Sequence, residues 1–238
     1  MDSAEIARLC ALEDRHWWYA ARRGVLRREA DAFARRRGGP GRALDVGAAG
    51  GGNTRVLADR GWQAAAVEQD EAAAAVARGR GVPAVRADAA LLPVAPGSVD
   101  LLVAMDVLEH LDDDRGAMAA WVAALAPGGR LLATVPADPA LWSAHDVAVG
   151  HRRRYGAVEL RALAEAAGAA VVDLRSWNVA LRPAIAWRRR SSTGSDLDRV
   201  PAPLNLALRA VVEAERFVPP LRRAPGVTLV LVADRPPP

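Results

Sequence analysis

Apolar residues fall along the chain in short blocks and in helically spaced stretches that follow one another in turn. Short, nearly continuous apolar blocks are typical of strands buried on both faces, whereas stretches with apolar residues three and four positions apart are typical of helices packed on a core. We therefore expect strands at 42–46, 62–68, 83–88, 98–107, 130–137, 169–177 and 226–234. We expect helices at 3–36, 53–61, 70–81, 112–129, 158–168 and 204–218, and irregular chain at 137–156 and 178–202.

The order of these elements, strand then helix along most of the chain, predicts an α/β fold with a doubly wound parallel sheet and helices on both of its faces. The 238 residues suit one domain, and no internal repeat divides them. Within this single domain of residues 1–238 we expect an N-terminal helical cap at 1–37, a core at 42–177 and 226–235, and a lid insertion at 178–225.

The basic charge of the chain says less about its partners than such a charge normally would. The formal net charge is +4 and the pI is about 10.3, but there is no lysine, so all 32 basic residues are arginines. Together with the abundant alanine, glycine and proline, this favours a coding bias, and the acids are spread among the arginines. The pattern therefore disfavours a nucleic-acid partner.

Cysteine usage and hydropathy indicate the compartment. Cys10 is the one cysteine, which excludes a disulfide within the chain and disfavours a cysteine-based metal site. The first ten residues lack the apolar stretch of a signal peptide, and no apolar run approaches the ~18 residues of a membrane helix. We expect a soluble, cytoplasmic protein without a membrane partner.

A glycine-rich stretch, ALDVGAAGGGNTRVL at 43–57, follows the first expected strand and opens a helix. Glycine allows a sharp turn and a close approach of a ligand to the main chain, and the free amides of a helix N-terminus attract negative charge. Ligands of doubly wound sheets bind at the carboxyl ends of strands. By itself, the stretch fits both a nucleoside site and a plain structural turn.

Acids at the ends of further strands favour the nucleoside site. Asp45 lies two residues before Gly47, Glu68 ends the second strand, and Asp88 follows the third. A carboxylate at the position of Glu68 can accept hydrogen bonds from both ribose hydroxyls. The fourth strand runs out in the sequence DLLVAMDVLEHL at 100–111.

This set of residues resembles the class I S-adenosylmethionine-dependent methyltransferases, a broad family of small-molecule methyltransferase domains. The family pattern is an acid and x-G-x-G-x-G after the first strand, acids after the next two strands, and vLEHl after the fourth. Ala49 departs from it at the middle glycine, and Val99 stands where an aromatic is usual. The G-x-G-x-x-G fingerprint of nicotinamide-dependent enzymes also fails at Ala49.

The resemblance implies a Rossmann-like sheet of seven strands with an antiparallel last strand. It also implies S-adenosyl-L-methionine as cofactor and S-adenosyl-L-homocysteine as product. By this resemblance, Gly47, Ala48 and Gly51 line the methionine part of the cofactor, Asp45 orders the loop, and Glu68 holds the ribose.

The same resemblance places the rest of the cofactor at later strand ends. Asp88 would accept from the adenine amino group, with Ala89 beside it and Gln69 flanking the ring. Met105 and Asp106 would face the sulfonium and the methyl group.

A branch of the family carries a segment similar to HWW at 16–18 near its N-terminus, on a helix that covers the cofactor. This implies that Trp18, Tyr19 and Arg23 reach the carboxylate end of the cofactor. His110, in the LEHL segment, is a further candidate for contact with the ligands, with packing at a helix start as the alternative.

The loop after the fifth strand supplies two candidate general bases, His145 and His151, because histidine suits proton transfer near neutral pH. The alternative is a hydrogen-bonded network of His145, Asp146 and Arg153 that holds the loop. The spacing of His145, Asp146 and His151 would also allow a metal site, but spacing alone is weak evidence for one, and we expect no metal.

The lid insertion combines arginines with an apolar helix, which predicts a partly hydrophobic cavity for a small-molecule or short-peptide acceptor. We expect in-line methyl transfer, driven by proximity, to a natural-product or secondary-metabolite intermediate. The alternatives are a peptide or RNA methyltransferase and a catalytically silent cofactor-binding partner module. The chain is expected to be a monomer or a homodimer.

Overall fold

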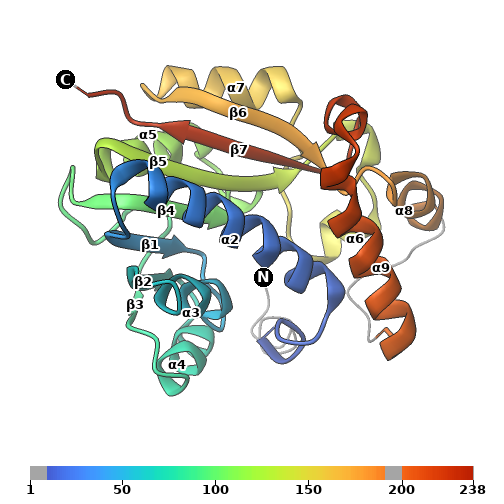
Figure 1. The fold of residues 1–238 in the computed structure, drawn as a ribbon, viewed down its shortest axis with the longest axis horizontal. Helices are drawn as coiled ribbons and strands as arrows, with labels where there is room; N and C mark the ends of the chain where they lie inside the picture. The colour runs from blue at the N-terminus through green and yellow to red at the C-terminus, as the bar shows by residue number, and fades with distance from the viewer. Residues whose placement is uncertain (1–9, 191–199, 238) are drawn as a thin grey trace.

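The computed structural model describes residues 10–190 and 200–237, so the expectations for residues 3–9 and 191–199 lie outside the described residues. Seven strands of the described chain form one sheet in the order β3-β2-β1-β4-β5-β7-β6 (Figure 1). The pairs from β3 to β5 are parallel, and β7 runs antiparallel to β5 and β6. The expected seven-stranded sheet with its antiparallel last strand is therefore confirmed. The strands are β1 (Arg42–Val46), β2 (Gln63–Glu68), β3 (Ala84–Arg86), β4 (Val99–Met105), β5 (Leu125–Pro136), β6 (Ala170–Trp177) and β7 (Thr228–Asp234).

The helices that the structure describes from Trp17 onward are α2 (Trp17–Arg37), α3 (Gly52–Ala58), α4 (Glu71–Gly79), α5 (Asp114–Ala124), α6 (Ala144–Ala148), α7 (Ala157–Ala166), α8 (Arg182–Arg189) and α9 (Ala202–Ala214). Short 3₁₀ turns are η1 (Leu108–His110), η2 (Pro139–Leu141), η3 (Glu215–Phe217) and η4 (Pro219–Arg223). None of the helices in the described ranges combines the length and the apolar character that crossing a membrane requires.

The helices cover both faces of the sheet because successive strand residues point to opposite sides. Along β4, Leu101, Val103 and Met105 pack toward α2, α3 and α9. Leu102 and Ala104 pack on the other face, toward α5 and α7. The sheet is thus buried on both sides, which explains why its strands are almost continuously apolar.

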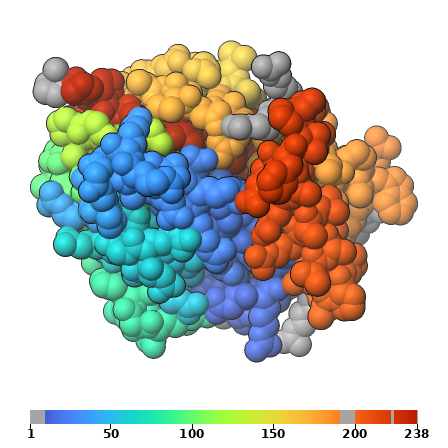
Figure 2. All heavy atoms as spheres, viewed as in Figure 1, coloured from blue at the N-terminus to red at the C-terminus, as the bar shows by residue number. Residues whose placement is uncertain are grey.

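The helical region expected over 3–36 is broken before Trp17, next to the HWW segment that interrupts its pattern. The helix that carries the tryptophans starts at Trp17, and the side chain of His16 caps it by accepting from the amide of Trp18 at 3.3 Å. Asn205 of α9 fastens this start, since its Oδ1 accepts from the Trp17 amide at 2.7 Å and its Nδ2 donates to the Arg15 carbonyl at 2.9 Å. Figure 2 shows α9 lying against α2 over this region.

Three further boundaries differ from the expectations. Helix α5 ends at Ala124 rather than at 129, because Leu125 already pairs with Val99 of β4. The stretch 178–202 is not wholly irregular: it contains α8, whose Pro183 lies in the first turn, where no helical hydrogen bond is lost. The irregular stretch 137–156 contains η2 and α6.

The turn after β1 is shaped by three residues with positive φ. Gly47 has φ +67°, and a Cβ there would lie 2.5 Å from Cγ2 of Val107, which follows β4. Gly51 has φ +79° and precedes the first residue of α3. Ala49 lies between them at φ 46°, a conformation that costs an L-residue about 1–2 kcal/mol. The glycines are thus required by backbone geometry and by the neighbouring turn.

Asp45 supports this turn from beneath. Its carboxylate is fully buried, and Oδ2 accepts from the Thr54 hydroxyl of α3 at 2.7 Å, while Oδ1 has no hydrogen-bond partner within 10–190 and 200–237. Burial raises the pKa of Asp45 from 3.8 to about 7, against the smaller opposing effect of the Thr54 hydrogen bond. The expectation that Asp45 orders the loop fits this position.

The Gly47→Ala substitution is expected to destabilise the protein by about 2–4 kcal/mol, because strain at positive φ adds to the overlap with Val107. Gly81→Ala is the matched control: Gly81 has φ +77°, but no atom lies within 4 Å of its added Cβ. Its cost is expected to be about 1 kcal/mol, from strain alone. Denaturant unfolding measures the free energy of unfolding of both variants. An equal loss in the two would contradict the close approach of the turn after β1 to the turn after β4.

The raised pKa of Asp45 predicts the sign of a pH effect. Because the folded protein holds this proton up to about pH 7 and the unfolded chain releases it near 3.8, stability falls as pH rises between these values. Relative to Asp45→Asn, the wild type is expected to lose as much as about 4 kcal/mol across this window. Unfolding free energies at several pH values test this, with the exposed Asp59→Asn as the control for a lost charge. A constant difference between wild type and Asp45→Asn would refute the prediction.

Candidate active site

A cavity of about 890 Å³ opens at the carboxyl ends of the parallel strands. Its volume falls within the range of roughly 300–1,000 Å³ that is usual for small-molecule sites. Its walls come from the start of α2, the segments that follow β1 to β5, and the helices α8 and α9. The segments that carry the family pattern, which are far apart in the sequence, are therefore neighbours in space.

The cavity gathers most of the residues predicted from the sequence. It is lined by Trp18, Tyr19, Arg23, Gly47, Ala48, Glu68, Gln69, Ala89, Met105, Asp106, His110, His145 and His151. Asp45, Gly51 and Asp88 are not part of its lining. The first two lie behind it, where they shape the turn after β1.

Glu68 stands fixed at the end of β2. Its Oε2 accepts from the amide of Ala49 at 2.8 Å, and its Oε1 accepts from the amide of Asp70 at 2.9 Å. Each carboxylate oxygen has a second lone pair that these amides leave unused. The side chain is thus oriented by the backbone and can still accept from a ligand in the cavity.

Asp88 is exposed, and its Oδ1 accepts from the amide of Ala90 at 2.8 Å. Its neighbours Ala87 and Ala89 border the cavity instead. The carbonyl of Ala89 is held by the indole N–H of Trp121 at 2.7 Å. Contact between Asp88 and the cofactor stays a prediction.

Arg22 reaches the end of β4, whereas the contact predicted between Arg23 and the cofactor stays a prediction. Its guanidinium pairs with Asp106 and donates to the Met105 carbonyl at 3.3 Å. Asp106 adopts φ 59° and also accepts from Thr134 at 2.8 Å. This network holds the carboxylate of Asp106 at the edge of the cavity.

Arg23 belongs to a second polar group beside the turn after β1. It donates to the carbonyl of Glu13 at 2.5 Å, and the Glu13 carboxylate pairs with Arg80. Arg80 also donates to the Gly50 carbonyl at 2.9 Å. Glu13, which the sequence reasoning missed, thus ties the segment before α2 to the glycine turn.

The aromatic segment is partly core and partly cavity wall. Trp17 is buried among the apolar residues between α2 and the sheet. Trp18 is half-buried and packs on Trp177 with ring centroids 5.0 Å apart. Tyr19 borders the cavity, and burial raises the pKa of its phenol well above its usual range.

The loop after β5 is organised around Asp146, which is fully buried. Its Oδ1 accepts from Nδ1 of His151 and from Nε of Arg154, each at 2.8 Å. Burial alone would raise the pKa of Asp146, but these two hydrogen bonds hold it well below its usual range. The partner is therefore Arg154 and not Arg153, which pairs with Asp114 instead.

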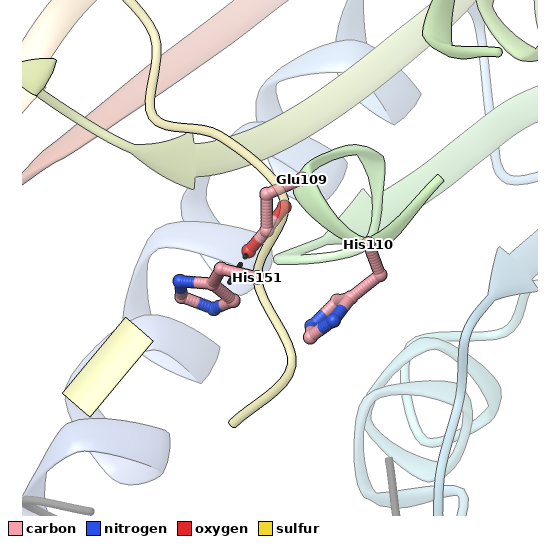
Figure 3. A group of neighbouring side chains, drawn as sticks. All are labelled: Glu109, His110 and His151. Carbon is pink, nitrogen blue, oxygen red and sulfur yellow. Dashed lines mark ion pairs between the residues drawn. The ribbon is translucent and has the colours of Figure 1, made fainter. Parts of the chain in front are cut away.

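Glu109 and His110 complete the wall beside His151, as Figure 3 shows. Glu109 is fully buried, and burial followed by the charge of Asp106 raises its pKa well above its usual range. Burial and then the neighbouring His151 lower the pKa of His110 to about 4. The sequence reasoning did not single out Glu109, because its neighbour His151 lies far away along the chain.

The residues that could hold a metal ion in the structure differ from His145, Asp146 and His151, the set suggested by the sequence. His145 lies with its ring centroid 6.1 Å from that of His151. Among the described residues, Glu109, His110 and His151 bring one potential ligand atom each to within 4.8 Å of one another. The expectation of no metal stays untested.

Comparisons with known proteins agree with this geometry. The family described as "Methyltransferase domain" matches residues 17–174. The chain is 28% identical over 171 residues to a ubiquinone biosynthesis O-methyltransferase of Idiomarina loihiensis, a match that covers 63% of this chain and 68% of the relative. It is 30% identical over 167 residues to a probable S-adenosylmethionine-dependent methyltransferase of Mycolicibacterium smegmatis, which covers 68% of this chain and 63% of that relative.

A solved structure, that of the [4+2]-cyclase SpnF, superposes with a TM-score of 0.60 at 26% identity, covering 89% of this chain and 82% of the other. The family match covers α2 and β1 to β5 and runs into β6, so it includes the segments that surround most of the cavity. The methyl donor of this family is S-adenosylmethionine. The chain belongs to the class I S-adenosylmethionine-dependent methyltransferases.

Proposed function

We propose that the protein methylates a hydroxyl group of a small molecule, an intermediate of natural-product or secondary metabolism. The observation that carries the proposal is the continuity of the cavity, which joins the strand ends of the cofactor pattern to the histidine-bearing loop after β5. The name of one relative, an O-methyltransferase of ubiquinone biosynthesis, supports oxygen as the methylated atom.

The residues present fit the cofactor of the family. The turn at Gly47 has no room for a side chain and lets a ligand approach the main chain, and Glu68 presents an oriented carboxylate. We assign Gly47, Ala48 and Gly51 to the methionine part, Glu68 to the ribose and Gln69, Asp88 and Ala89 to the adenine. When bound, the cofactor supplies a methyl group already activated by positively charged sulfur.

The acceptor is assigned to the end of the cavity beneath α8 and α9. Apolar side chains of these helices and their flanking residues border that end, among them Leu181, Ile185, Leu204 and Leu208. Trp18 faces the same cavity from α2. We therefore propose that residues 178–225 act as a lid over a partly hydrophobic acceptor, which excludes water while Met105 and Asp106 border the reacting groups.

His151 is the favoured residue for activating the acceptor. The ionised carboxylate of Asp146 accepts from Nδ1, so Nδ1 carries the proton and Nε2 keeps a lone pair. His151 borders the cavity, so a hydroxyl bound there can interact with this lone pair. His145 remains the second candidate, because it also lines the cavity.

A second candidate function is cofactor binding without methyl transfer. The structural relative described as a [4+2]-cyclase favours it, since its name gives a reaction that transfers no methyl group. Ala49 in place of the middle glycine points the same way. The two functions differ in one observable, the formation of a methylated product.

The His151→Ala variant is expected to lose at least about 100-fold in turnover, because the group that activates the hydroxyl is gone. Its affinity for S-adenosylmethionine is expected to stay within about threefold, since the cofactor pattern is intact. Turnover is measured by mass spectrometry with a panel of hydroxylated aromatic and lipid-like small molecules, and cofactor affinity by calorimetry.

His145→Ala is measured in parallel to separate the two histidines. Wild-type turnover in both variants, each shown to be folded, would remove histidine from the mechanism. Tight cofactor binding by the wild type with no methylated product from any acceptor would favour the binding module instead.

A further inference from the structure

The carboxylate of Glu109 is a buried polar group in the cavity wall. It is 0% exposed, and neither carboxylate oxygen has a hydrogen-bond partner among the described residues. A buried carboxylate without partners is strongly unfavourable, so such a group takes up a proton or binds a cation. Two nearby arginines are engaged elsewhere, Arg22 with Asp106 and Arg154 with Asp146.

In each of the two histidines beside Glu109, an acceptor oxygen lies next to Nδ1. Nδ1 of His110 lies 3.0 Å from the carbonyl oxygen of Gly150, and Nδ1 of His151 lies 2.8 Å from Oδ1 of Asp146. Because both oxygens are acceptors, each Nδ1 donates, and in the neutral form of each ring Nε2 is then the nitrogen with the free lone pair. Metal-binding histidines are commonly oriented in this way, by a carbonyl or carboxylate on the other ring nitrogen.

The distances between these groups suit a single ion. Nε2 of His151 lies 3.7 Å from Oε1 of Glu109, which is too long for a hydrogen bond. One ligand atom from each of Glu109, His110 and His151 lies within 4.8 Å of the others. Two bonds of about 2.0–2.2 Å at a tetrahedral angle place ligand atoms about 3.3–3.6 Å apart, so the three side chains close around an ion by shifts of about an ångström. In Figure 3 the carboxylate of Glu109 points at the ring of His151, and the ring of His110 lies beside it.

We propose that Glu109, His110 and His151 bind one divalent transition-metal ion, with zinc as the best fit, in a site that opens on the acceptor region. Two imidazoles and a carboxylate suit zinc and its neighbours better than magnesium or calcium, which prefer oxygen ligands. Three protein ligands leave a coordination position open toward the cavity. The ion satisfies Glu109, and Asp146 becomes the residue that orients a ligand.

This site deepens the proposed function, on which its role in the reaction rests. A cation beside an acceptor hydroxyl lowers the pKa of that hydroxyl, as it does for bound water. The hydroxyl proton then passes to solvent, and the oxygen forms a bond to the methyl carbon while the carbon–sulfur bond breaks and sulfur keeps the electron pair. In the metal-loaded protein His151 holds the ion and does not itself take the proton.

The test is a zinc titration followed by calorimetry, on protein made without a polyhistidine tag and stripped with a chelator. Wild type is expected to bind one zinc ion per chain, and cobalt is expected to give the visible absorption of a low-coordinate nitrogen and oxygen site. Glu109→Gln and His110→Gln are expected to weaken zinc binding at least about tenfold. His145→Gln, a histidine of the same cavity outside the cluster, is the matched control and is expected to bind zinc within about threefold of wild type.

The absence of stoichiometric zinc binding by folded wild type would overturn the proposal, and so would an equal loss in His145→Gln and Glu109→Gln. Circular dichroism and thermal unfolding confirm that each variant is folded, and zinc is expected to raise the melting temperature of wild type but not of Glu109→Gln. S-adenosylmethionine binding and methyl transfer are measured separately in chelator. Methyl transfer at full rate in chelator would overturn the metal site and leave the proposed function standing. Zinc binding without methyl transfer to any acceptor would overturn the proposed function and leave the metal site standing.

Discussion

The turn after β1 and the turn after β4 approach each other so closely that position 47 cannot carry a side chain. A Cβ on Gly47 would overlap Val107, and the positive φ of Gly47 would strain any other L-residue. This contact brings the glycine turn beside Met105 and Asp106, so the two segments share one cavity wall. Since parallel strands end at one edge of the sheet, the segments after β2, β3 and β5 meet them there. The fold thus assembles the methyltransferase site from pieces that are separate in sequence.

Buried ionic networks hold the rest of the cavity in shape. Asp106 is fixed by Arg22 and Thr134, and Asp146 by His151 and Arg154. Breaking such a pair leaves an uncompensated buried charge, so each carboxylate keeps its partners and its position. Glu109 is as deeply buried, but its carboxylate accepts no hydrogen bond from the described residues, and Nε2 of His151 lies 3.7 Å from it. The proposed cation would supply the partner that this buried carboxylate lacks among the described residues.

Local patterns predicted the parts of the structure that depend on neighbouring residues. The strand at Arg42–Val46, the glycine turn and the acid at Glu68 are all recognisable within short windows. The ion pair between Arg22 and Asp106 could not be predicted, because adjacent helical residues point about 100° apart and the phase of α2 on the sheet is a tertiary property. The proximity of Glu109 and His151 has no local signal, since the chain brings them together only after β5 and α6 are in place. Helix α8 was missed because Pro183 and the arginines were interpreted as irregular chain, although proline is tolerated in a first helical turn.

The central claim is that the carboxyl ends of β1, β2 and β3 hold the nucleoside of S-adenosylmethionine. The most direct measurement is a crystal structure of the protein with S-adenosyl-L-homocysteine. The account predicts that the ribose hydroxyls bind Glu68, that the adenine lies beside Gln69 and Ala89, and that the sulfur faces Asp106. A nucleoside bound elsewhere, or a cavity that stays empty at saturating ligand, would contradict the account.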